Sequence, residues 1–171
     1  MRSSTSATSE VSPGARIRAR VAGQLENLLL VLVVFWAGAL WTVGFVVAPV
    51  LFDLIPERAL AGSIAGRLFQ TTWWISYGVG TCVLLHAFAR GAVRSAVFWI
   101  TLAMIALALV SAFGIQPRIA ELRALMGSDE ALRARFAMWH GVSSMLYAMQ
   151  GMLAVVLVVK FARGLPRRDA A

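Results

Sequence analysis

Polar side chains that could bind a ligand recur on one side of the last apolar stretch of the chain, residues 136–159. At 100° per residue, an arc of about 120° on that helix holds His140, Ser143, Ser144, Tyr147, Gln150 and Gly151. Residues 68–89 carry a second set on one helical side, at Gln70, Trp74, Tyr77 and Thr81. Because exposure to lipid is costly, a polar side chain in a membrane usually faces protein or a wet cavity. The two sets predict a polar pocket for a small ligand or a partner, with the candidate residues His140, Ser143, Ser144, Tyr147, Gln70 and Tyr77.

The same residues allow a second interpretation, in which they only hold the helices together. Ser, Thr, Gln and Tyr side chains routinely form hydrogen bonds between membrane helices. His140 has further chemistry, since an imidazole can change its charge near neutral pH and can ligate a metal ion. From the sequence, both interpretations stay open.

Methionines on the opposite face of the same stretch suggest a copper site as an alternative. Met138, Met145, Met149 and Met152 project close to one another, and thioethers are soft ligands suited to Cu(I). Packing or lipid contact is the competing explanation, because methionine fills irregular gaps well. The weak metal candidates are therefore His140, Met145 and Met149. A cysteine cluster and an intrachain disulfide are excluded, because Cys82 is the only cysteine.

The two histidines raise a haem hypothesis, which their depths disfavour. His140 begins its stretch whereas His86 ends another, so their depths differ by roughly 20 Å at 1.5 Å per residue. One haem iron cannot reach ligands that far apart. The chain also lacks a Walker-type loop, an HExxH motif and a G-x-S-x-G elbow. We predict no cofactor and a non-enzymatic protein, with a haem-containing redox protein as the less favoured alternative.

Four long uncharged stretches must position these residues, at 28–52, 68–89, 96–116 and 136–159. Each is long enough to cross about 30 Å of hydrocarbon as a helix. With 60% hydrophobic and 14% charged residues, the chain of 171 residues has the composition of a membrane protein. The predicted fold is an all-α membrane protein, a four-transmembrane-helix bundle over residues 25–162.

The segments outside the spans carry local signals of their own. Leu60, Ile64 and Leu68 recur at four-residue spacing, which predicts a short amphipathic helix in the first outer loop. Ser128 and Asp129 supply N-cap chemistry for a helical extension before the fourth span. Residues 1–24 lack apolar patterning and predict a disordered cytoplasmic tail, and residues 163–171 predict a basic cytoplasmic tail.

The basic residues give the predicted orientation. With both termini in the cytoplasm, ten basic residues lie inside, Arg2, Arg16, Arg18, Arg20, Arg90, Arg94, Lys160, Arg163, Arg167 and Arg168. Six lie outside, Arg58, Arg67, Arg118, Arg123, Arg133 and Arg135, so the positive-inside rule favours this arrangement. The net charge of +8 indicates anionic lipid headgroups rather than nucleic acid as the partner, with a homo-oligomer or a membrane partner also possible. The predicted location is the bacterial inner membrane.

Two segments carry a family resemblance. The matching residues are Gly44, Pro49, Leu51, Phe52, Pro56, Ala61, Gly62, Gly66, Leu68 and Phe69, followed by Pro117, Ile119, Leu122, Arg123, His140 and Ser143. In these the chain resembles the bacterial domain-of-unknown-function family 4149, which is similar to transmembrane protein 205 of animals, and more distantly the CopD-type copper-resistance proteins. The resemblance implies a four-helix fold and an undefined biochemical role. The chain departs from the family pattern at Gln70, Thr71 and Thr72, where aromatic residues or proline usually follow the Leu68-Phe69 pair.

Overall fold

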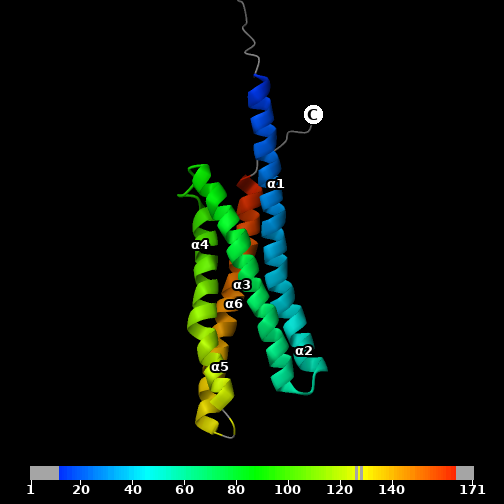
Figure 1. The fold of residues 1–171 in the computed structure, drawn as a ribbon, viewed down its shortest axis with the longest axis vertical. Coiled ribbons are helices and arrows are strands. Elements are labelled where there is room, and N and C mark those ends of the chain that lie inside the picture. Colours follow the sequence, from blue (N-terminus) through cyan, green and yellow to red (C-terminus); the bar gives the residue numbers. More distant parts are fainter. Residues whose placement is uncertain (1–11, 126, 128, 165–171) are drawn as a thin grey trace, which may run out of the picture.

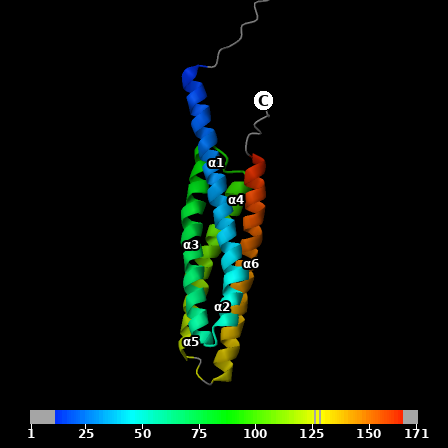
Figure 2. The same cartoon turned by 90° about the vertical axis from the view of Figure 1, so that its right-hand side faces the viewer.

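The structure, a computed structural model, describes residues 12–125, 127 and 129–164, and this part of the chain contains helices and loops but no strand. The elements are α1 (Pro13–Thr42), the π-helix η1 (Val43–Val47), α2 (Ala48–Leu54), α3 (Arg58–Ala89), α4 (Ala96–Leu109), the π-helix η2 (Val110–Ile115), α5 (Gln116–Leu125) and α6 (Glu130–Gly164). Among the described residues they join into four long helical rods, 13–54, 58–89, 96–125 and 130–164, which lie side by side (Figure 1). Figure 2 shows the same rods from the side, with α1 extending beyond the others.

Three of these rods are long and apolar enough to cross a membrane, which makes the chain a multi-pass membrane protein. They are Pro13–Leu54, Ala96–Leu125 and Glu130–Gly164. Large apolar side chains such as Phe35, Leu85 and Phe113 are exposed on the outside of the rods, where lipid would solvate them. Helix α3 has 32 residues but is not in this set. Polar residues along α3, including Thr72, Ser76 and His86, lower its mean hydropathy.

The ends of the rods differ from the sequence-based expectation. Helix α1 begins at Pro13, with the Ser12 hydroxyl accepting a hydrogen bond from the Ala15 N–H at 3.4 Å. Proline suits the first helical position and serine suits the N-cap, so both residues favour a helix start there. The prediction of a disordered tail was therefore wrong for residues 13–24, and residues 1–11 lie outside the described part. Residues 163 and 164 end helix α6, and the rest of the predicted basic tail, 165–171, also lies outside it.

The predicted separate surface helix in the first loop was wrong, because α3 runs unbroken from Arg58 to Ala89. Ala61 and Ala65 are buried in the first turns of α3, where α3 packs against α2. That packing fixes the segment in line with the rest of the rod. In the last loop, the Asp129 carboxylate accepts hydrogen bonds from the N–H groups of Ala131 and Leu132, at 2.8 and 3.3 Å. Helix α6 then runs from Glu130 to Gly164 without a break.

Proline explains the two π-helical segments. In each rod the residue just before the proline, Ala48 before Pro49 and Gln116 before Pro117, donates its N–H to a carbonyl five residues back. Proline has no N–H and its ring clashes with the carbonyl four residues back, so regular α-helical bonding cannot continue through it. A π-helical segment, in which an N–H bonds to the carbonyl five residues back, lets backbone hydrogen bonding continue through one wider turn. Each of these rods therefore contains one local widening.

The best-packed region lies at the end of the bundle where α3 joins α4. Its core contains Leu29, Val33, Trp36, Leu40, Val79, Val83, Met104, Ala154 and Leu157. Ser76 connects the rods there: its hydroxyl accepts from Trp36 Nε1 at 2.8 Å and from Gln150 Nε2 at 3.5 Å. Gln150 Nε2 also donates to the Met104 carbonyl at 3.2 Å. These hydrogen bonds tie all four rods together in an otherwise apolar interior.

At the opposite end, which we call the α2–α5 end, the rods form two separate pairs. Helix α2 packs on α3, and α5 packs on α6. The two pairs diverge toward this end of the molecule (Figure 1). The divergence makes room for a cavity between them.

Candidate functional site

A cavity of about 350 Å³ lies between the two diverging helix pairs, and we call it the aromatic pocket. All four rods contribute to its walls. Its lining residues are Gly44, Phe45, Ala48, Pro49, Phe52, Gly62, Ala65, Gly66, Phe69, Trp73, Ser111, Gln116, Ile119, Arg123, His140, Ser143, Ser144, Tyr147 and Ala148. Pockets for small ligands range from about 300 to 1,000 Å³, so this one suits a small molecule.

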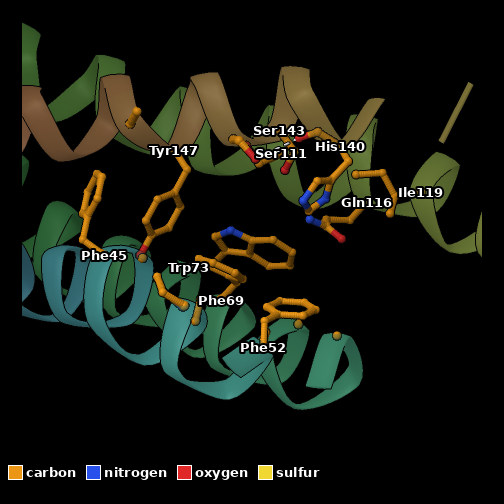
Figure 3. A pocket seen from close by; sticks show the side chains of 18 of the residues that line it. Phe45, Phe52, Phe69, Trp73, Ser111, Gln116, Ile119, His140, Ser143 and Tyr147 are labelled. Carbon is orange, nitrogen blue, oxygen red and sulfur yellow. Dashed lines mark hydrogen bonds between the residues drawn. The ribbon is translucent and has the colours of Figure 1, made fainter. Parts of the chain in front are cut away.

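Aromatic rings dominate one wall of the pocket. Phe52, Phe69 and Trp73 project into it from α2 and α3, opposite α6 (Figure 3). Phe69 contacts the ring of Tyr147 edge to face, with the centroids 4.8 Å apart at 78°. Together with Ala48 and Ala65 these rings give the pocket an apolar interior.

Polar groups converge from the other wall, on η2, α5 and α6. Ser111, Gln116, His140 and Ser143 face the aromatic wall in Figure 3. The His140 ring stacks on the Phe136 ring, with centroids 5.8 Å apart at an angle of 6°. An apolar slot with a few convergent polar groups is the usual form of a ligand site.

Tyr147 closes the deep end of the pocket. Its hydroxyl donates a hydrogen bond to the Leu40 carbonyl at 2.7 Å. Its ring occupies the space beside Gly44, where a Cβ atom would overlap the ring. The π-helix η1 begins at this level of the first rod, so the widened turn and the tyrosine ring fit together.

The pocket includes four of the six predicted ligand-binding residues, His140, Ser143, Ser144 and Tyr147. Gln70 and Tyr77 do not line it. Gln70 is exposed, one residue from Phe69 on α3, and Tyr77 packs edge to face on Trp74 with centroids 5.8 Å apart. Gln150, on the same polar stripe as His140, joins the buried network at Ser76 instead.

The candidate metal ligands do not converge. Met145 is 76% exposed and Met149 is 39% exposed, and neither lines the pocket that holds His140. No group of three or more His, Cys, Asp or Glu side chains that could hold a metal ion occurs in the described residues. His86 lines a second cavity of about 190 Å³, at the end where α3 joins α4. The two histidines therefore lie in different cavities.

A family model matches the part of the chain that supplies most of the pocket-lining residues. The model of a domain of unknown function, DUF4149, matches residues 31–128, more than half of the chain. The chain belongs to this family. No curated protein and no solved structure matches the chain.

The DUF4149 match includes the pocket walls from Gly44 to Arg123 and ends before α6. His140, Ser143, Ser144 and Tyr147 complete the pocket from outside the matched range. Each rod of the DUF4149 region that carries a π-helix presents that segment to the pocket, with Gly44 and Phe45 from η1 and Ser111 from η2.

Sequence reasoning missed the aromatic wall and the residues Ser111, Gln116 and Arg123. The signal that would have found them is the pair of prolines inside apolar stretches, Pro49 and Pro117. Membrane helices tolerate proline because neighbouring groups or local π-helical turns re-satisfy the backbone, and π-helical turns occur frequently at functional sites. The residues within about two turns of each proline supply much of the pocket lining.

Proposed function

We propose that this DUF4149 protein is a non-enzymatic membrane protein that binds a small, largely apolar molecule in the aromatic pocket. The observation that carries the proposal is the joint occurrence of a 350 Å³ cavity, an aromatic wall and convergent polar side chains. A protein that needed only a stable bundle would close this space, because buried voids forgo packing contacts. Here the two helix pairs diverge instead, and the space between them stays open.

The π-helices support the same proposal. Lipid-exposed irregular backbone is costly in a membrane, so it is retained where it faces protein or lines a cavity. Both π segments line the aromatic pocket through at least one residue. Their coincidence at one site favours a binding role over two independent helix irregularities.

The proposal includes four membrane spans. Helix α3, with 32 residues, is about 48 Å long at 1.5 Å per residue, which exceeds the hydrocarbon thickness. It packs against both α1 and α4, which belong to rods that are apolar enough to span. A membrane helix can carry polar residues on faces that other helices cover, as Thr72 and Ser76 are covered here.

The proposed orientation puts both termini in the cytoplasm of a bacterial inner membrane, so the α2–α5 end and the open side of the pocket face outward. Single cysteines at Gly127 and at Arg94, in a Cys82→Ser background, test it with a membrane-impermeant maleimide on intact spheroplasts. We expect labelling at position 127 and protection at position 94. The reverse pattern contradicts either the orientation or the crossing of α3, because a protein with only three spans would exchange the sides of these two positions. Labelling at both positions contradicts the crossing of the 96–125 rod.

Copper handling stays the alternative hypothesis, without a specific geometric observation in its favour. His140 lines the pocket, whereas Met145 projects from the outer surface of α6. Elemental analysis of the purified full chain tests this alternative. Stoichiometric copper that is lost on His140→Ala would favour it over a pocket for an organic ligand.

Filling the pocket tests the proposed binding function. Gly66 lines the pocket and has open space where a Cβ atom would stand, so Gly66→Leu adds a bulky side chain whose first atom meets no neighbour. Gly78→Leu is the matched control, because Gly78 lies in the same helix, also has open space, and is outside the pocket. The probe is a diazirine derivative of 1-decanol, cross-linked to the full chain in lipid nanodiscs.

We expect cross-links to map to pocket residues such as Phe52 and Trp73, and an excess of 1-decanol to suppress them. Gly66→Leu should abolish this saturable labelling, and Gly78→Leu should retain it. Saturable labelling that is equal in wild type and Gly66→Leu would contradict the proposal. Labelling that 1-decanol does not suppress would contradict it as well.

A further inference from the structure

We infer that the ligand of the aromatic pocket carries an anionic headgroup, a carboxylate or a phosphate, and that Arg123 binds it at the mouth of the pocket. This inference rests on the proposed binding function and adds the chemical class of the ligand. The ligand class is an anionic amphiphile, with an apolar chain among the aromatic rings and its headgroup at the α2–α5 end.

Arg123 spans the gap between the two helix pairs. It belongs to the last turn of α5, yet its Nη2 atom lies 3.7 Å from the point where a Cβ atom on Gly62 of α3 would stand. The ring of Phe52 lies 3.8 Å from the same point. The guanidinium group therefore sits across the pocket mouth, beside the aromatic wall.

Among the described residues, the guanidinium has no carboxylate partner within 4 Å. Arg90 and Glu26 form an ion pair at the far end of the molecule, and no ion pair among the described residues involves Arg123. The contact found for Arg123 is a cation–π contact, with its Cζ atom 5.8 Å from the centroid of Phe136. A guanidinium carries five N–H donors in a planar fork that matches a carboxylate or a phosphate.

The local charge favours an anion. None of the described residues that line the pocket is acidic, so Arg123 faces no competing carboxylate there. His140 stacks on the same Phe136 ring that Arg123 contacts, and its imidazole can supply a further donor. Gln116 and Ser143 add neutral hydrogen-bonding groups on the same wall.

The interior of the pocket suits the hydrocarbon chain of a ligand rather than a second polar group. Ala48, Ala65, Phe69 and Trp73 form its apolar surface. A ligand with a charged head and an apolar body places each part against matching chemistry, because burying a charge among these rings would be costly.

The test compares four amphiphiles with the same ten-carbon chain as competitors of the decanol cross-link: decanoate, decyl phosphate, 1-decanol and decyltrimethylammonium. The full chain is used in nanodiscs of zwitterionic lipid and, separately, in nanodiscs that contain phosphatidylglycerol. The variants are Arg123→Gln and its control Arg118→Gln, which changes an exposed arginine of the same helix that does not line the pocket.

We expect decanoate or decyl phosphate to compete about tenfold more strongly than 1-decanol, a ratio that corresponds to about 1.4 kcal/mol of binding free energy. Arg123→Gln should remove this preference while 1-decanol still competes, and Arg118→Gln should keep it. Weaker competition by all free amphiphiles in the phosphatidylglycerol nanodiscs would identify a bilayer lipid as the source of the anionic headgroup. Unchanged competition there would identify a free amphiphile.

Equal competition by the anionic and neutral amphiphiles, or an anion preference that survives Arg123→Gln, would overturn the inference and leave the pocket itself intact. Failure of this inference can be distinguished from failure of the proposed binding function. If no amphiphile of any charge competes and Gly66→Leu is labelled like the wild type, the proposed binding function itself is contradicted.

Discussion

The Tyr147 hydroxyl donates a hydrogen bond to the Leu40 carbonyl at 2.7 Å, across the contact of α6 with α1. Leu40 lies just before η1, where the hydrogen-bonding pattern of the first rod changes from α to π. The Leu40 carbonyl also accepts a hydrogen bond from the Val43 N–H, so the tyrosine hydroxyl is a second donor to it, from another helix. Tyr147 therefore connects α6 to the first rod beside η1 and also forms the deep end of the aromatic pocket.

Tyr147→Phe removes that hydroxyl and retains the ring. We expect the free energy of unfolding to fall by about 0.6 kcal/mol, and by no more than about 1.7 kcal/mol, the average and the maximum measured for hydrogen bonds between membrane helices. Denaturation in mixed micelles measures the change. Tyr77→Phe is the control, because the Tyr77 hydroxyl is buried without a hydrogen-bond partner in the described structure, and its removal should not destabilise the protein. Equal destabilisation by the two variants would contradict this assignment.

Gly44→Ala tests the close approach of η1 to α6. A Cβ atom at this position would overlap the Tyr147 ring, so the two helices must separate or the ring must leave its site. We expect a loss of about 1–3 kcal/mol in the free energy of unfolding, as for other overpacked interiors, and weaker binding of the decanol probe. Gly38→Ala, in α1, meets nothing within 4 Å and should leave both quantities unchanged or improve stability. A stable Gly44→Ala variant with normal binding would show that the ring position is unimportant.

Ser76→Ala tests the buried network in the well-packed half. The change leaves the indole N–H of Trp36 without its acceptor and removes one partner of Gln150. We expect destabilisation by about 1–3 kcal/mol, because a buried donor without a partner retains its desolvation cost. Saturable decanol labelling should remain, since Ser76 does not line the pocket. Ser63→Ala, at an exposed serine that bonds only to its own helix, is the control with no expected effect.

The sequence predicted the helical class and the side of α6 that faces the pocket, because both follow from periodicity along one helix. His140, Ser143, Ser144 and Tyr147 fall on one stripe and line one cavity. The side of α3 that faces the pocket was harder to predict, because it depends on how α3 is rotated about its own axis relative to α6. Gln70 and Tyr77 form a regular stripe, yet α3 turns Phe69 and Trp73 to the pocket instead.

Two further differences between the sequence-based prediction and the structure arise from tertiary packing. The amphipathic spacing of Leu60, Ile64 and Leu68 predicted a surface helix, whereas the burial of Ala61 and Ala65 against α2 keeps this segment in line with the span. The divergence of the two helix pairs also has no local pattern in the sequence. The sequence feature that comes closest to indicating the divergence is the proline in each of the two rods that carry a π-helix.

Pro49→Ala tests whether the proline that accompanies η1 is needed for ligand binding in the aromatic pocket. Alanine restores an N–H that can bond to the Phe45 carbonyl four residues back, so the first rod can continue as a regular α-helix and η1 should disappear. A proline inside a helix costs about 3 kcal/mol relative to alanine in water, so the variant should be at least as stable as the wild type. A regular α-helix rotates Gly44 and Phe45 relative to Pro49, which misaligns the pocket wall that these residues form.

We therefore expect Pro49→Ala to gain or keep stability and to bind the decanol probe several-fold more weakly, as when a functional distortion is relieved. Amide chemical shifts of residues 43–49 report the change from π to α bonding. Pro56→Ala, in the loop between α2 and α3 and outside the pocket, is the control. Normal binding in a variant whose shifts show a regular α-helix would separate the π-helix from the function. Retention of η1 with alanine at position 49 would show instead that the packing of Tyr147 on Gly44, rather than the proline, imposes the π-helical turn.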